Sequence, residues 1–139
     1  MSTLRVDNLK GKTTDLAVNV FASHNSGTTT TNLEQGLAKA WVNFTGVTTT
    51  AARDSLNISS LTDTDTGDTT VNINNNMNND DFACVMFTNA NSGEGAGAFG
   101  NQYLGSLHAR TTGSVGHTSY SSSPIDAALN DIIFHGDLA

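Results

Sequence analysis

The chain has few charged side chains, and few of those are basic. Its 139 residues include six Lys or Arg and 13 Asp or Glu, which give a formal net charge of −7. Nucleic-acid binding draws on clustered Lys and Arg that displace phosphate counterions, so this balance argues against a nucleic-acid partner. No stretch approaches the roughly 18 apolar residues of a spanning helix, which argues against membrane insertion.

Cysteine is nearly absent as well. The single cysteine, Cys84, excludes an intrachain disulfide and a metal site built from several cysteines. The opening residues, Met1 to Arg5, lack the apolar segment of a secretory signal, so we expect no such signal.

The sequence offers few candidate metal or catalytic sites, and none of them matches a known pattern well. Asp63, Asp65 and Asp68 surround Gly67, but their spacing does not match the calcium loop, which has glycine at position six and a bidentate Glu at twelve. A hairpin loop is the favoured interpretation. The four histidines lie far apart at no zinc-ligand spacing, and we expect them at the surface. We therefore expect no metal, no cofactor and no enzymatic activity.

Small polar residues dominate what is present. Thr, Asn, Ser and Gly number 20, 16, 13 and 13, and all are poor in helix interiors. Only two short segments, residues 31–37 and 123–129, suggest helices. Leu, Ile, Val and Phe together number 30 of 139, just above the level of roughly a fifth below which chains tend to stay disordered. We therefore expect copies of the chain to share apolar burial.

Apolar and polar residues alternate over short segments that are separated by turn-rich stretches. The segments are residues 16–21, 38–44, 56–59, 70–73, 82–87, 104–109 and 132–134. Phe82 to Phe87 is apolar on both parities, as is typical of a strand covered on both faces. The pattern predicts an all-β fold, an antiparallel β-sandwich of jelly-roll-like type with an extended N-terminal arm.

The first 37 residues differ in composition from the rest of the chain. Half of the chain's six positive charges lie within residues 5–12, and few large apolar residues precede Leu16. We divide the chain into an arm, residues 1–37, and a β-sandwich domain, residues 38–139. The arm is expected to add to a sheet edge of a partner. The alternative is that Leu4, Val6 and Leu9 pack on the same subunit or on its trimer neighbours. Its anchoring residues are expected to be Leu4, Arg5, Val6, Leu9, Lys10 and Lys12.

Three segments of the β region follow one another in a characteristic order. They are residues 38–46 (AKAWVNFTG), 52–63 (ARDSLNISSLTD) and 66–73 (TGDTTVNI). In order and spacing they resemble a domain of tail-fibre-like virion structural proteins of tailed bacteriophages, marine cyanophages especially. Residues 1–9 (MSTLRVDNL) are similar to the opening of many phage appendage proteins of that group.

The resemblance implies a non-enzymatic virion protein, usually a homotrimer, assembled in the host cytoplasm. Its partners would be copies of itself and other virion structural proteins of the tail, fibre or capsid. Surfaces rich in hydroxyl and amide groups also suit host attachment through a surface glycan, for which Trp41 and Tyr103 are candidate stacking residues. Packing in the core is the alternative role for Trp41.

Two other functions stay open at this point. One is a capsid decoration or cement protein that stabilises the phage head, since a short chain with an arm fits that position equally. The other is a sugar-active enzyme, which needs two carboxylates facing one substrate. The 11 Asp and two Glu offer no obvious pair of this kind.

Overall fold

The computed structural model describes residues 19–23, 28–32, 36–89, 104–121 and 123–139. The chain divides into two compact units, Met1–Leu37 and Ala38–Ala139. In the first unit, β1 (Asn19–Ser23) pairs antiparallel with β2 (Thr28–Asn32). The six residues expected to anchor the arm lie outside the described residues, so anchoring stays a prediction.

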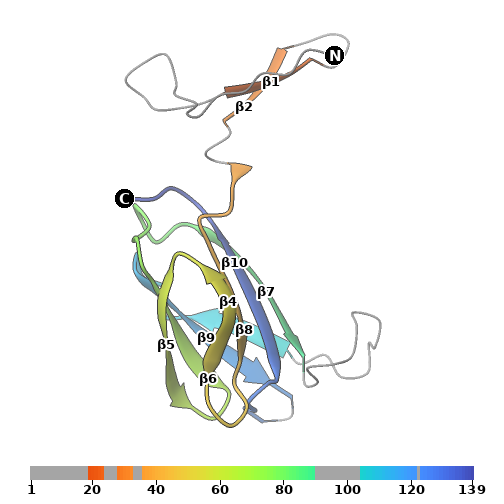
Figure 1. The fold of residues 1–139 in the computed structure, drawn as a ribbon, viewed down its shortest axis with the longest axis vertical. Coiled ribbons are helices and arrows are strands. Elements are labelled where there is room, and N and C mark those ends of the chain that lie inside the picture. Colours follow the sequence, from red (N-terminus) through yellow and green to blue (C-terminus); the bar gives the residue numbers. More distant parts are fainter. Residues whose placement is uncertain (1–18, 24–27, 33–35, 90–103, 122) are drawn as a thin grey trace. The chain divides into compact units, whose positions relative to one another are not determined.

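In its described residues, the second unit holds eight strands in two four-stranded antiparallel sheets (Figure 1). The first sheet has the order β4-β3-β10-β7, and the second has the order β5-β6-β9-β8. The strands are β3 (Ala40–Thr45), β4 (Ala51–Leu56), β5 (Ile58–Asp65), β6 (Asp68–Ile73), β7 (Ala83–Asn89), β8 (Leu104–His108), β9 (Ser114–Tyr120) and β10 (Leu129–His135). The prediction of an all-β antiparallel sandwich is confirmed.

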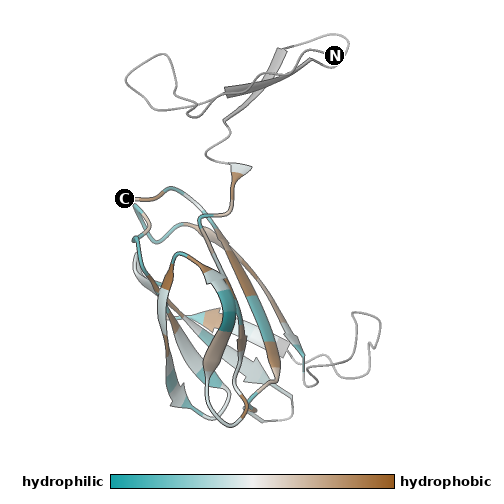
Figure 2. Ribbon diagram, viewed as in Figure 1, coloured by the Kyte–Doolittle hydropathy of each residue, from teal (hydrophilic) through white to brown (hydrophobic). Residues whose placement is uncertain are grey.

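The core lies between the two sheets, where alternate side chains of each strand point inward. In β3, residues Ala40, Val42 and Phe44 are buried while their neighbours in sequence are half-exposed, as the alternation predicts. Other strands and loops complete one apolar cluster. Its further members are Val71, Ile73, Met77, Phe82, Val115, Ile132 and Phe134. Figure 2 shows that apolar and polar segments follow one another along the strands.

Two sequence predictions of local structure are wrong. Residues 56–59 do not form one strand, because Asn57 takes a left-handed φ of 58° and turns the chain from the first sheet into the second. Residues 123–128 form no helix, because their backbone groups bond elsewhere: Ala127 O accepts from Gly46 N, and Ile125 N donates to Ser119 O. Strand β10 then begins at Leu129.

No helix among the described residues is long and apolar enough to cross a membrane.

Candidate functional site

The outer face of the first sheet carries one apolar residue from each of its four strands. Leu56 of β4 is the register partner of Trp41 in β3, which faces Ile133 of β10, which in turn faces Val85 of β7. Phe87 lies two residues further along β7. We call these five residues the apolar band.

The apolar band is uncovered in the single chain. The exposed fraction is 48% for Leu56, 42% for Ile133, 66% for Val85 and 36% for Phe87, while Trp41 is partly buried. The sequence predicts that residues 82–87 are covered on both faces. In the single chain, Phe82 belongs to the core, and the inward residues Cys84 and Met86 pack against it. The outward residues of β7 have no cover, although their chemistry suits a covered position.

A polar row borders the apolar band on the same face. Asn43 of β3 is the register partner of both Asp54 and Asp131, and its side-chain amide donates a hydrogen bond to the Asp131 carboxylate. Phe87 is the register partner of Asp131 on the other side. The bond to Asn43 satisfies part of the Asp131 charge next to the apolar residues.

The outer face of the second sheet is mostly polar, although Tyr120 of β9, 41% exposed, lies at its end. Its polar members are Ser60, Thr62, Asp68, Thr70, Asn72, Ser106, His108 and Thr118, which we call the polar face. The Asn72 amide donates to the hydroxyls of Ser60 and Thr62, both at 3.1 Å. Cross-strand hydrogen bonds of this kind stabilise a sheet whose outer side is exposed to solvent.

Two histidines lie on opposite sides of the second sheet. His108 belongs to the polar face, with Nε2 at 3.5 Å from the Asp68 carboxylate and Nδ1 at 3.3 Å from the Thr118 hydroxyl. Its ring lies over Gly116, where a Cβ would come within 2.5 Å of Nε2. The expected surface position is therefore correct for His108.

The surface position expected of every histidine is wrong for His117. It is 1% exposed, its Nε2 lies 3.2 Å from the Thr88 hydroxyl, and its ring meets Phe44 edge-on with centroids 5.4 Å apart. Burial lowers the pKa of His117 to about 4, and the nearby Asp68 carboxylate opposes that change. The structural reason is register, because His117 is the partner of the inward Leu107 and Thr69.

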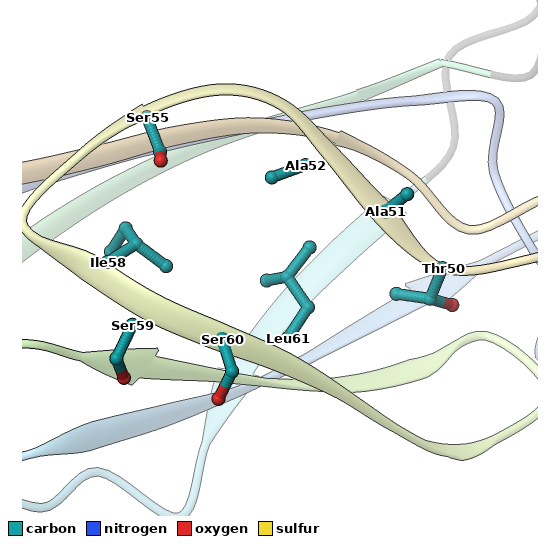
Figure 3. Close-up of a pocket in the computed structure, with 8 residues that line it drawn as sticks. All are labelled: Thr50, Ala51, Ala52, Ser55, Ile58, Ser59, Ser60 and Leu61. Atoms are coloured by element: carbon teal, nitrogen blue, oxygen red, sulfur yellow. The ribbon is translucent and has the colours of Figure 1, made fainter.

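A cleft of about 290 Å³ opens between β4 and β5, at one edge of the sandwich (Figure 3). Ser55 and Ala52 point into it from β4, and Ile58 and Leu61 point into it from β5. Its other lining residues are Thr50, Ala51, Ser59 and Ser60. No charged side chain lines this cleft, so it suits a small neutral group that has both hydroxyl and apolar surface.

Hydrogen bonds lie near both ends of the cleft. At one end, Asn57 is the single residue that joins β4 to β5, and its side chain bonds to Lys39 and Asn75. At the other end, the Thr50 hydroxyl donates to the Asp63 carboxylate at 3.0 Å. These bonds tie the segments around the cleft to one another and to Lys39 and Asn75.

The structure describes only some of the predicted site residues. Trp41 lies in the apolar band, on the outer side of the first sheet, and Tyr103 lies outside the described residues. Of the three carboxylates considered for calcium, Asp63 bonds to Thr50, Asp65 accepts from Thr66 N, and Asp68 faces His108. Among the described residues, no group of three or more His, Cys, Asp or Glu is arranged to hold a metal ion.

Sequence reasoning predicted a second covered face for residues 82–87, but it missed the apolar band that crosses all four strands, and it missed the cleft. The apolar residues at both parities of β7 were a usable signal for the band, since one parity must face away from the core. The cleft had no comparable signal, because it depends on Asn57 turning the chain between sheets.

No family model, curated protein or solved structure matches this chain.

Proposed function

We propose that this protein is a non-enzymatic structural protein of a bacteriophage virion. In this proposal it is a trimeric, tail-fibre-like surface appendage that docks through residues 1–37 and displays residues 38–139 for contact with host-surface glycans. The observation that carries it is the two-sided sandwich, with an uncovered apolar band on one sheet and a hydroxyl- and amide-rich face on the other.

The segments that resemble phage tail-fibre-like proteins form consecutive strands of the domain. Residues 38–46 contain β3, residues 52–63 contain most of β4 and β5, and residues 66–73 contain β6. These segments supply Trp41 and Leu56 of the apolar band and most of the cleft lining. The resemblance therefore falls on the residues that build the candidate surfaces, which supports a shared use of them.

The apolar band supports self-association. The polar face and the cleft between β4 and β5 support contact with glycans. Hydroxyl and amide groups of the polar face can donate hydrogen bonds to sugar hydroxyls and can also accept hydrogen bonds from them. The neutral cleft between β4 and β5 combines hydroxyls with aliphatic surface, as a sugar ring does. Trp41 is a poorer candidate than the sequence suggests, because its neighbours Leu56 and Ile133 flank it in the apolar band.

A structural role is also supported by how the carboxylates are used. Asp126 accepts from Gly67 N at 2.7 Å, Asp131 accepts from Asn43, and Asp63 accepts from Thr50. Each of these bonds ties two distant segments of the chain together. The carboxylates therefore stabilise the fold where a glycosidase would turn two of them toward one substrate.

Immunogold labelling tests the proposal. An antibody raised against the purified full chain is applied to tailed phage particles purified from the source of the sequence, with pre-immune serum as the control. We expect gold particles on the tail or its fibres. Gold distributed over the head would favour the capsid decoration alternative, and particles without label would overturn both virion roles.

A further inference from the structure

We infer that the outer face of the second sheet binds a neutral glycan at one end, where Tyr120, Thr118, Ser106, His108 and Asp68 lie together. We call these five residues the Tyr120 site. The inference rests on the proposed contact with host-surface glycans, and it assigns that contact to one surface and to ligands without charge.

Three neighbouring strands bring the Tyr120 site together. Thr118 of β9 is the register partner of Asp68 in β6 and of Ser106 in β8. Tyr120 follows Thr118 by two residues on β9, so both side chains lie on the same face of the sheet. His108 follows Ser106 by two residues on β8 and lies on that face for the same reason. The site therefore crosses β6, β9 and β8.

The His108 ring is seated where β9 has no side chain. A Cβ on Gly116 would lie 2.5 Å from Nε2 and 2.8 Å from Cε1 of the ring, so glycine leaves the room that the ring needs. Nε2 lies 3.5 Å from an Asp68 carboxylate oxygen, and Nδ1 lies 3.3 Å from the Thr118 hydroxyl. The ring is thus positioned before a ligand arrives, which lowers the entropy cost of binding. A face that meets only solvent does not need a histidine fixed in this way.

The Tyr120 site also offers polar groups that the fold does not use. Within the described residues, no hydrogen bond engages Oδ2 of Asp68 or the hydroxyl of Ser106. The Asp68 side chain is partly exposed, and Ser106 is exposed. A carboxylate oxygen accepts hydrogen bonds from sugar hydroxyls, and a serine hydroxyl both donates and accepts. The site can therefore meet a ligand whose hydroxyls are both donors and acceptors.

Tyr120 supplies the apolar part of the site. Its exposed side chain lies at the end of a face whose other named members are Ser, Thr, Asn, Asp and His. The C–H face of a pyranose ring packs on an aromatic ring, and tyrosine offers such a surface at low entropy cost because it has two side-chain torsions. An aromatic ring beside hydroxyl, imidazole and carboxylate groups matches the apolar face and the polar edge of a sugar.

Charge and apolar area select a neutral glycan among the possible partners. The polar face includes neither Lys nor Arg, and Asp68 has a second carboxylate, Asp65, as its register partner on β5. Phosphate, sulfate and uronic acid groups are therefore repelled by this face of a chain whose net charge is −7. A protein partner would need aromatic and aliphatic residues at the centre of the contact, whereas the centre of this face is polar.

Affinity electrophoresis of the full chain tests the inference. Native gels are cast without additive, with one of the neutral polysaccharides dextran, mannan and galactan, or with the anionic polysaccharide alginate. Tyr120→Ala removes the ring from the site. Phe87→Ala is the matched control, because it removes an exposed ring from the outer face of the first sheet. Ser55→Phe fills the cleft between β4 and β5, and circular dichroism checks that each variant is folded.

We expect at least one neutral polysaccharide to slow the wild type, Phe87→Ala and Ser55→Phe, and alginate to slow none of them. Tyr120→Ala should bind that polysaccharide about tenfold more weakly or worse. Loss of binding in Ser55→Phe but not in Tyr120→Ala would overturn the inference, move the glycan to the cleft and leave the proposed glycan contact intact. Retardation by alginate alone would contradict a neutral ligand.

A wild type that no neutral polysaccharide slows would also overturn the inference. That result is separate from the proposed virion role, which immunogold labelling tests without reference to any ligand. Label on the tail of the particle together with no retardation would leave the structural role standing and remove the glycan site.

Gly116→Ala tests the positioning of His108 by itself. The new Cβ displaces the ring while the side chains of the Tyr120 site are all still present, and the partly exposed ring can swing into solvent. We expect affinity for the same polysaccharide to fall about 3- to 10-fold with an unchanged circular dichroism spectrum. His108→Ala should cause a similar fall and should add little to Gly116→Ala. Wild-type affinity of both variants would show that His108 takes no part in binding, against the inference.

Discussion

The side chain of Asn57 pairs with the backbone of Asn75 as a second peptide group would. Its Oδ1 accepts from Asn75 N at 2.7 Å, and its Nδ2 donates to Asn75 O at 3.1 Å and to Lys39 O at 3.1 Å. Asn57 O also accepts from Asn74 N at 3.0 Å. Asn57 thus holds the corner between β4 and β5 and ties it to the loop after β6.

Substitution of Asn57 should separate its backbone role from its hydrogen bonds. Asn57→Ala loses the side-chain bonds and places a Cβ without compensation at a φ of 58°, so we expect a loss of about 2–4 kcal/mol in unfolding free energy. Asn57→Gly loses the same bonds but tolerates the φ, so its loss should be smaller by about 1 kcal/mol. Urea unfolding measures both. Equal losses would show that backbone strain is unimportant at this corner.

The hairpin between β5 and β6 depends on Gly67. Its φ is +72°, and a Cβ there would lie 2.5 Å from Ile125 N and 2.7 Å from Ser119 O, both of which are backbone atoms. We expect Gly67→Ala to cost more than about 2 kcal/mol of unfolding free energy. Gly36→Ala is the control, because nothing lies within 4 Å of its Cβ. Its effect should be within about 0.5 kcal/mol. Similar midpoints for the two variants in thermal unfolding would refute this prediction.

His117 should make the domain less stable in acid. Burial lowers its pKa to about 4 when folded, whereas the unfolded value is near 6.5, so the unfolded chain binds more protons between these values. Stability from this group is complete above pH 6.5 and is lost as the pH falls toward 4, by up to about 3 kcal/mol.

The measurement for His117 is unfolding free energy against pH for the wild type and for His117→Gln. Glutamine does not titrate and can still bond to the Thr88 hydroxyl, so the variant is expected to lose less stability than the wild type across this range. Other acidic groups titrate in both proteins and cancel in the difference. Two parallel curves would mean that His117 does not carry the effect.

Deletion of residues 2–12 should separate anchoring from folding. We expect trimers of normal thermal stability that no longer incorporate into virions, because the segment removed lies outside the unit Ala38–Ala139 that contains the sandwich. Native mass, thermal unfolding and particle incorporation are measured on the same preparation. Trimers that dissociate or melt much earlier would show that the arm packs on its own trimer.

The class of fold follows from local patterns in the amino-acid sequence. Alternation in residues 38–44 and 70–73 selects which side chains of β3 and β6 are buried, and scarce helix formers leave strands as the main element. These signals are local, since a strand with period-two alternation must turn one set of side chains to the core. The two parities of β7 even indicated a second covered face.

Tertiary structure decided everything that depends on pairing between distant strands. Register places His117 inside and His108 outside, although both lie in similar polar surroundings in the sequence. Order within the sheet brings Leu56, Trp41, Ile133 and Val85 into one row from four separate segments. No local pattern encodes such a row, because a shift of one residue in any pairing would send its side chain to the opposite face.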